Sequence, residues 1–181
     1  MRSRFALLRD QRGFNLVETM VALGMLASVL VVVLGLFIYA RRNVYSGKEM
    51  TRAVSIGTRV TEDLSAMDKS ALRVAFNLPA TVGANVTVAG QTFANSFRRS
   101  TKAISAANDP SGFLQRWQNT LTADNKFQDA EVVLVITPSV DTVTPATLGG
   151  ASIVHVRAFV IWQEFKRQRH ITLTQIKVQR E

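Results

Sequence analysis

Hydrophobic residues are concentrated in one uninterrupted block near the start of the chain. Residues 19–40 form a run of 22 without any charged side chain. At a helical rise of about 1.5 Å per residue such a run spans roughly 33 Å, enough to cross the hydrocarbon core of a bilayer. Tyr39 lies at the expected interface, and Arg41 and Arg42 end the run, as is typical of anchors at a membrane surface. The pattern predicts a transmembrane helix.

Two other interpretations of this block fit the pattern less well. A buried core helix rarely exceeds ~14 residues that are apolar on every side. A cleaved secretory signal has an apolar core of only ~7–15 residues, and no small-x-small cleavage pattern precedes Arg41. The orientation in the membrane stays open, because four basic residues precede the run and four follow it closely.

A helical pattern continues beyond the apolar block. Residues 43–77 lack proline, and apolar or small residues recur there at steps of three and four. This stripe consists of Met50, Ala53, Gly57, Val60, Leu64, Met67, Ala71 and Val74. Pro79 predicts a stop near Asn77, since a residue before proline disfavours helical geometry and Leu78 is in that position. One helix from Phe14 to about Asn77, roughly 95 Å long, is therefore expected.

The remainder of the chain has the pattern of a small α+β domain. Asp109 and Pro110 predict the start of a short helix. Three strands are predicted after it, at residues 131–137, 152–163 and 171–178. In the last strand the apolar residues fall out of phase, which predicts a bulge near Thr174 or Gln175. A further short strand is expected at 85–92, and a charged turn at 164–170.

One acidic residue stands at the head of the apolar block. Glu18 directly precedes the uncharged run and follows Gly13 and Phe14 by four to five positions. A carboxylate costs about 2.5–3.5 kcal/mol at mid-bilayer and less near the interface, so an acid in a membrane helix points to a function. The alternative is that Glu18 complements the helix dipole, which contributes roughly 0.3–1 kcal/mol.

The segment around Glu18 resembles the N-terminus of type IV pilins and pseudopilins. Residues 1–13 form a short basic leader that ends in Gly13, Phe14 follows, Glu18 comes four residues later, and a long apolar helix begins. The resemblance implies that a prepilin peptidase cleaves between Gly13 and Phe14 and that the new Phe14 amine is methylated. It also implies that Glu18 pairs with the terminal amine of a neighbouring subunit during filament assembly, although a pairing within one chain is a rival.

The same resemblance implies a location and a fold. The leader would stay in the cytoplasm of a bacterial cell, the helix would cross the inner membrane, and the head would lie in the periplasm. The implied fold is the α+β pilin "lollipop", a long N-terminal helix packed against a small antiparallel sheet. The implied segments are a leader at 1–13, a transmembrane and assembly helix at 14–40, an amphipathic continuation at 41–78 and a globular head at 79–181. The hairpin pattern at 156–174 is similar to that of V-class minor pilins and I-class pseudopilins.

The charge balance adds a second candidate activity. The chain carries 22 Lys+Arg against 13 Asp+Glu, a formal net charge of +9. The leader carries four arginines and one aspartate, a charge of +3, so its removal lowers +9 to +6. Phosphate contacts dominate the affinity of proteins for nucleic acid, so basic clusters are candidates for DNA binding. The candidate residues are Arg98, Arg99, Lys102, Lys166, Arg167 and Arg169.

No pattern for catalysis or for a cofactor emerges. His155 and His170 fall in predicted strands without a carboxylate at ligand spacing, and the chain has no cysteine, so no metal site and no enzymatic activity is predicted. Three functions remain open: a minor type IV pilin that primes, caps or decorates the pilus, a minor pseudopilin of a type II secretion system, and a membrane-tethered DNA receptor. The implied partners are other pilin or pseudopilin subunits, the prepilin peptidase, the inner-membrane assembly platform and the lipid bilayer.

Overall fold

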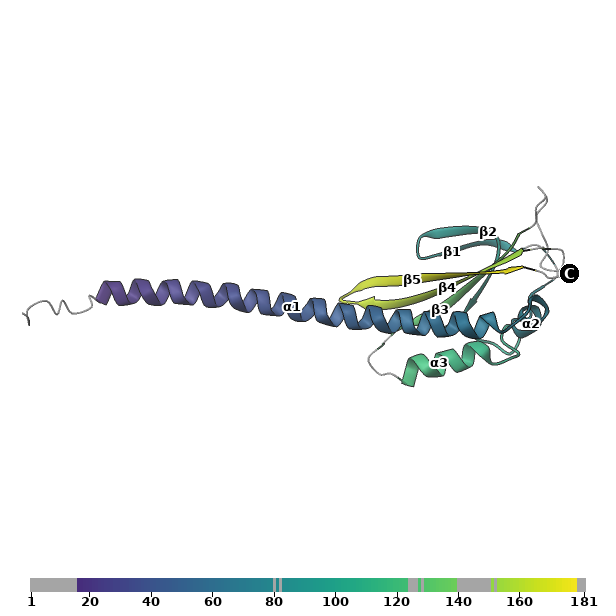
Figure 1. Ribbon diagram of the computed structural model, residues 1–181, viewed down its shortest axis with the longest axis horizontal. Helices are drawn as coiled ribbons and strands as arrows, with labels where there is room; N and C mark the ends of the chain where they lie inside the picture. The colour runs from purple at the N-terminus through teal and green to yellow at the C-terminus, as the bar shows by residue number, and fades with distance from the viewer. Residues whose placement is uncertain are drawn as a thin grey trace, which may run out of the picture. The chain divides into compact units, whose positions relative to one another are not determined.

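The computed structural model describes residues 16–79, 81, 83–123, 127, 129–139, 151 and 153–178. The chain divides into two compact units, Met1–Ser46 and Gly47–Glu181. Helix α1 (Leu16–Ser65) contributes to both, and the other elements belong to the second unit (Figure 1). These are α2 (Lys69–Ala75), β1 (Ala84–Val88), β2 (Gln91–Ser100), α3 (Phe113–Ala123), β3 (Glu131–Ser139), β4 (Ile153–Glu164) and β5 (Arg167–Val178).

The second unit is built on one five-stranded antiparallel sheet in the order β1-β2-β3-β4-β5. The C-terminal part of α1 and helix α3 lie on one face of this sheet, and the β1–β2 hairpin at its edge folds over the opposite face of β3 and β4 (Figure 1). Ala53, Val60 and Leu64 of α1 are fully or almost fully buried against the sheet. The predicted fold class, a long N-terminal helix packed against an antiparallel sheet in an α+β arrangement, is confirmed.

The continuous apolar sequence of strand β3 follows from its position in the middle of the sheet, where both of its faces are covered. Val132, Leu134 and Ile136 pack into the cluster on the helix side of the sheet, while Val133 and Val135 pack into a second cluster on the opposite side. A strand that is covered on both faces needs apolar residues at successive positions rather than at every second one. The strand also extends two residues beyond its predicted end at Thr137, through Pro138 and Ser139.

Strand β4 follows the predicted alternation on the helix side. Its even-numbered residues from 154 to 162 are all buried in the helix-side cluster. The odd-numbered Phe159 and Ile161 are also buried, under the β1–β2 hairpin, where the Phe93 and Phe159 rings lie 5.7 Å apart in an edge-on arrangement. Arg157 lies 4.9 Å from the centre of the Phe93 ring, so this face combines apolar packing with a cation–π contact.

Close approach between α1 and the sheet depends on Gly57. A Cβ atom at this position would lie 2.3 Å from Cδ1 of Leu173 and 3.4 Å from both Cδ1 of Ile171 and Cγ2 of Val160. The absent side chain therefore lets the helix backbone lie directly on strands β4 and β5. Gly57 thus belongs to the helical stripe predicted from the sequence because it is small, and not because it buries an apolar side chain.

The expected single helix to Asn77 is wrong, because α1 ends at Ser65 and α2 starts at Lys69. The carboxylate of Asp68 caps α2 by accepting a hydrogen bond of 2.6 Å from the backbone N–H of Ala71. Nζ of Lys177, from β5, donates to the carbonyl oxygens of Leu64 and Met67 where α1 ends. Burial lowers the pKa of the Lys177 ammonium, and the nearby Asp68 carboxylate partly opposes that shift.

The break in the helix changes which residues of the predicted stripe are buried. Ala53, Gly57, Val60 and Leu64 face the core as expected. Met50 and Val74 are exposed instead, and α2 buries Leu72 and Ala75. A three-residue interruption rotates the second helix relative to the first, so the spacing of three and four no longer continues across it.

Two predictions about the sheet also fail. The pairing of β4 with β5 runs without interruption from Ile153↔Val178 to Glu164↔Arg167, so the expected bulge near Thr174 or Gln175 is absent. Gln175 pairs with Val156 on the helix side, and Ile176 is 57% exposed on the other face. The expected charged turn at 164–170 is only Phe165 and Lys166, both with positive φ, which is the geometry of a tight hairpin turn.

The segment before β3 holds more structure than the sequence predicted. The single strand expected at 85–92 is a hairpin, with Ala89 and Gly90 at positive φ in its turn. Strand β2 then continues to Ser100 and includes the basic residues Arg98 and Arg99. Helix α3 starts at Phe113 rather than at Pro110, but Oδ2 of Asp109 does accept a hydrogen bond of 3.0 Å from the N–H of Gln115.

Candidate functional site

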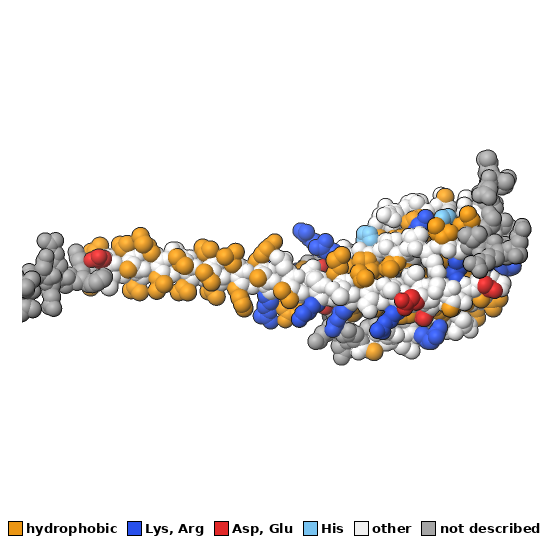
Figure 2. Space-filling view, viewed as in Figure 1, with side chains coloured by type: hydrophobic (Ala, Val, Ile, Leu, Met, Phe, Trp, Pro, Cys, Tyr) orange, Lys and Arg blue, Asp and Glu red, His pale blue; other side chains and the backbone are white. Residues whose placement is uncertain are grey.

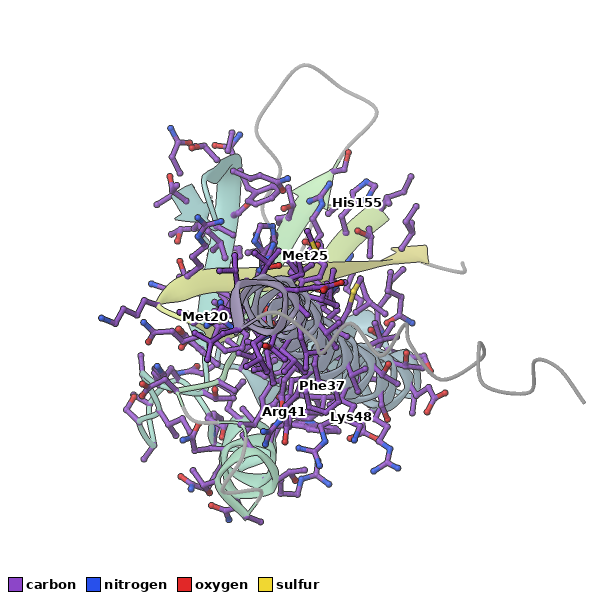
Figure 3. The ribbon with its side chains drawn as sticks, turned by 90° about the vertical axis from the view of Figure 1, so that its left-hand side faces the viewer. Met20, Met25, Phe37, Arg41, Lys48 and His155 are labelled. Atoms are coloured by element: carbon purple, nitrogen blue, oxygen red, sulfur yellow. The ribbon has the colours of Figure 1, made fainter. Side chains whose placement is uncertain are left out.

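The first candidate site is the N-terminal part of α1. All side chains of residues 16–45 are exposed, and the most apolar 18-residue window of the helix has a mean hydropathy of 2.8. Figure 2 shows hydrophobic side chains along this part of the helix, and Met20, Met25 and Phe37 project to different sides of it (Figure 3). A helix that is apolar all round requires an apolar environment. By length and composition, this helix is compatible with a membrane span.

Polar groups inside the run are satisfied within the helix. The hydroxyl of Ser28 donates a hydrogen bond of 2.7 Å to the carbonyl oxygen of Met25, and that of Thr19 donates to Leu16 at 3.1 Å. Nη2 of Arg41 donates to the Tyr45 hydroxyl at 3.4 Å, and its guanidinium lies 5.5 Å from the centre of the Tyr45 ring. The Thr19 and Ser28 hydroxyls of the run therefore have partners without water, as a bilayer core requires, and Arg41 contacts Tyr45 just beyond the run.

Glu18 lies in the first turn of α1 and is exposed. At this end of a helix the free backbone N–H groups favour a negative charge. Gly13 and Phe14, the predicted cleavage and methylation positions, lie outside the described residues. The position of Glu18 at the head of the apolar segment is thus consistent both with dipole complementation and with a role in contacts with another subunit.

The second candidate site consists of the basic residues proposed to bind DNA. The structure places Arg98 and Arg99 on β2 and the basic residues 166, 167 and 169 at the β4–β5 turn. Nη2 of Arg98 forms an ion pair of 3.2 Å with Oε1 of Glu131, which also accepts from the Ser100 hydroxyl. Arg99 donates from Nε and Nη2 to the carbonyl oxygen of Phe76 at 3.0 and 2.9 Å. Burial lowers the pKa of the Arg99 guanidinium. Both arginines therefore have partners within the domain, and the Arg98 side chain remains half exposed.

The other basic residues lie at the β4–β5 turn or just after the end of β2. Lys166 and Arg167 are exposed at the turn. Nε of Arg169 lies 3.4 Å from Oε2 of Glu164, which offsets one of the positive charges. Lys102 is exposed just beyond β2 and lines a shallow hollow together with residues of β3, β4 and β5. The sequence could not reveal these pairings, because Glu131 and Glu164 reach the arginines only through the folded sheet.

Histidines do not gather at a site. His155 pairs with Ile176 across β4 and β5, and the His170 ring lies 6.5 Å from the Phe159 ring. Within the described ranges, no group of three or more His, Cys, Asp or Glu residues could hold a metal ion.

Comparisons with known proteins do not assign the chain to a family. No protein-family model matches it, and neither a curated protein nor a solved structure was found to be similar. The functional argument therefore depends on the residues of this chain and their chemistry.

Proposed function

We propose that this protein is a membrane-anchored structural subunit of a type IV pilus-like filament, in the role of a minor pilin. One observation carries the proposal: Glu18 occupies the first turn of a helix in which the next 22 residues are uncharged, and Phe14 and Gly13 precede it by four and five positions. A basic leader, a cleavable Gly–Phe bond, an acid and an apolar helix in this register form the pilin-like pattern. The proposed role is non-enzymatic.

The chemistry of assembly follows from the proposed cleavage. Removal of residues 1–13 would give Phe14 a new α-ammonium, four residues from Glu18. Opposite charges at about 4 Å attract strongly in a medium of low dielectric constant, but both must lose their hydration. The net gain in free energy is therefore small, and the pair acts chiefly to set the register between subunits. Glu18 of one subunit would meet the Phe14 amine of a neighbour.

The rest of the molecule suits this role. The apolar part of α1 supplies a surface that either lipid or a bundle of like helices can cover. The independent unit Gly47–Glu181 supplies a folded domain with its own core. The proposed location is the bacterial inner membrane, with the domain in the periplasm, and the proposed partners are other pilin subunits, the prepilin peptidase and the assembly platform.

The first test is the N-terminus of the protein in membranes. We expect N-terminal sequencing and mass spectrometry to find a chain that begins at Phe14 with a methylated amine, in cells that contain a prepilin peptidase. In cells without the peptidase the chain should begin at Met1. A chain that begins at Met1 in both strains would refute the pilin assignment.

The second test separates filament assembly from membrane insertion. Glu18→Ala should leave the protein in the membrane fraction but reduce its amount in sheared filaments, because the register pair is lost. Glu62→Ala is the matched control, since Glu62 is also exposed on α1 but lies in the folded domain. Equal incorporation of both variants would contradict the assembly role of Glu18.

The same filament chemistry serves a pilus or a type II secretion pseudopilus. Neighbouring genes distinguish them: a retraction motor indicates a pilus, and a secretion operon indicates a pseudopilus. The DNA-receptor hypothesis is weakened, because Arg98, Arg99 and Arg169 have partners within the protein.

A further inference from the structure

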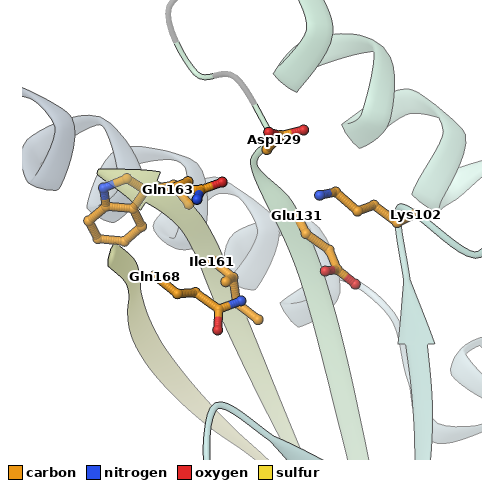
Figure 4. Close-up of a pocket in the computed structure, with 7 residues that line it drawn as sticks. Lys102, Asp129, Glu131, Ile161, Gln163 and Gln168 are labelled. Atoms are coloured by element: carbon orange, nitrogen blue, oxygen red, sulfur yellow. The ribbon is translucent and has the colours of Figure 1, made fainter. Parts of the chain in front are cut away.

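A shallow hollow of about 320 Å³ lies on the sheet beside the ends of β2, β3, β4 and β5. It is lined by Lys102, Asp129, Glu131, Ile161, Trp162, Gln163 and Gln168. Lys102 reaches in from one side, and Gln163 and Gln168 lie on the other (Figure 4). This volume is at the lower end of the range of small-molecule sites, about 300–1,000 Å³.

The strands hold Glu131, Ile161, Gln163 and Gln168 in fixed relation to one another. Gln163 and Gln168 are direct partners across the β4–β5 pair, and Glu131 is the partner of Ile161 across β3 and β4. Glu131 is further held by Arg98 and Ser100. Paired strands therefore fix the Gln163 and Gln168 side of the hollow, while Lys102 and Asp129 lie in the turns next to β2 and β3.

Four polar side chains at the hollow have unused hydrogen-bonding capacity. Within the described part of the chain, the side chains of Lys102, Asp129, Gln163 and Gln168 make no hydrogen bond or ion pair, and all four residues are exposed. Together they offer an ammonium donor, a carboxylate acceptor and two carboxamides that can both donate and accept. The buried Ile161 adds an apolar contribution to the lining.

The charges at the hollow select the class of ligand. Arg98 offsets the charge of Glu131, and Lys102 and Asp129 carry opposite charges, so the charges of these four side chains sum to zero. A phosphate would meet two carboxylates, and a simple cation would meet Lys102. A hydroxyl group both donates and accepts, so a polyol with several hydroxyls in fixed geometry uses all four side chains, while its C–H groups can contact Ile161.

We infer that this hollow is a binding site for a neutral saccharide, formed by Lys102, Asp129, Gln163 and Gln168. The inference does not depend on the pilin assignment, since it concerns only the domain Gly47–Glu181. It would give the protein a contact with glycan that is separate from the apolar part of α1.

The experiment uses the full chain in micelles of a polyoxyethylene detergent, because glycoside detergents would compete for the site. Saturation-transfer NMR would measure binding of a glucose trisaccharide and of an N-acetylglucosamine trisaccharide. We expect binding of at least one trisaccharide. A preference for the amino sugar would indicate cell-wall glycan, and a preference for glucose would indicate a surface or external polysaccharide.

Variants assign the binding to the hollow. Gln163→Ala should weaken affinity about fivefold and Asp129→Asn about tenfold, as expected for loss of a neutral and of a charge-assisted hydrogen bond. Gln91→Ala is the matched control, because Gln91 is an exposed glutamine on β2 that does not line the hollow. Circular dichroism would show that the three variants are folded.

Further probes separate this inference from its alternatives. Saccharide binding should change little between about 50 and 200 mM salt, whereas binding through phosphate contacts would fall steeply. Failure of both trisaccharides to bind, equal weakening by Gln91→Ala, or binding of glycylglycine or a short DNA duplex in place of saccharide would each overturn the inference. None of these results would bear on cleavage at Phe14.

Discussion

The two parts of helix α1 show how one secondary structure serves two environments. In the N-terminal part every side chain from residue 16 to 45 is exposed, and apolar residues surround the helix on all sides. In the C-terminal part Ala53, Val60 and Leu64 form a single buried stripe against the sheet. Helical geometry is common to both, so the difference lies in what covers the apolar side chains: protein in one case, and in our proposal lipid or neighbouring helices in the other.

The two parts also use glycine differently. Gly24 and Gly35 have open space where a Cβ would be, whereas a Cβ on Gly57 would overlap the Leu173 side chain. A glycine in a helix costs about 0.5–1 kcal/mol relative to alanine. At Gly57 this cost is offset by close packing of α1 on the sheet, and within the described residues nothing offsets it at the other two positions.

The largest predicted difference is between two leucines of this helix. Leu64 is 1% exposed and Leu30 is 53% exposed. Leu64→Ala should lower the free energy of unfolding of the domain by about 2–5 kcal/mol, because it leaves a cavity in the core. Leu30→Ala should leave it unchanged. Urea titration in micelles would measure both, with fluorescence of Trp117 and Trp162, which both lie in the domain core and are the chain's only tryptophans.

Equal destabilisation by the two leucine substitutions would contradict the division of α1 into a buried and an unburied part. No effect of Leu64→Ala would show that α1 does not pack on the sheet as described.

A smaller effect is expected at Gly57. Gly57→Ala places a Cβ against Leu173 and should destabilise the domain by about 1 kcal/mol, since overpacking outweighs the gain in helix propensity. Gly47→Ala is the control, because nothing lies within 4 Å of its Cβ position. The same urea titration applies, and stabilisation by Gly57→Ala would show that the Leu173 side chain can move aside at little cost.

The smallest predicted effect depends on pH. Asp68→Ala removes the cap of α2 and should slightly lower the stability of the domain at neutral pH. Hydrogen bonds from the N–H of Ala71 and then from the Ser70 hydroxyl lower the pKa of Asp68 below its usual 3.8. The folded state therefore binds this proton less readily than the unfolded state does, so the stabilisation is present above pH 3.8 and is lost as the pH falls through the folded pKa.

The difference in stability between the unmodified protein and Asp68→Ala should accordingly shrink when urea titrations are repeated at decreasing pH. Asp63→Ala, which changes an exposed aspartate within α1, serves as the control. A constant difference for Asp68→Ala across this pH range would mean that the carboxylate does not cap α2.

The sequence by itself determined the features that depend on local pattern. The uncharged run, the buried positions from Ala53 to Leu64 and the alternation in β4 are periodic signals, and the structure has the corresponding helix and strand. The α+β class followed from the same periodicity. Glu18 stood out because a charge beside an apolar run is visible without any fold.

Only the tertiary structure decided the features that depend on distant residues. Lys177, more than a hundred positions away in sequence, binds the carbonyl oxygens of Leu64 and Met67 at the break after Ser65, whereas the local sequence marks only the start of α2, with the Asp68 cap. Gln175 takes an inward position because unbroken pairing with β4 fixes its face, against the preference of the apolar residues for a bulge. Arg98 and Arg99 bind Glu131 and the Phe76 carbonyl for the same reason: a side chain's partner is set by the fold, and only its chemistry is set by the sequence.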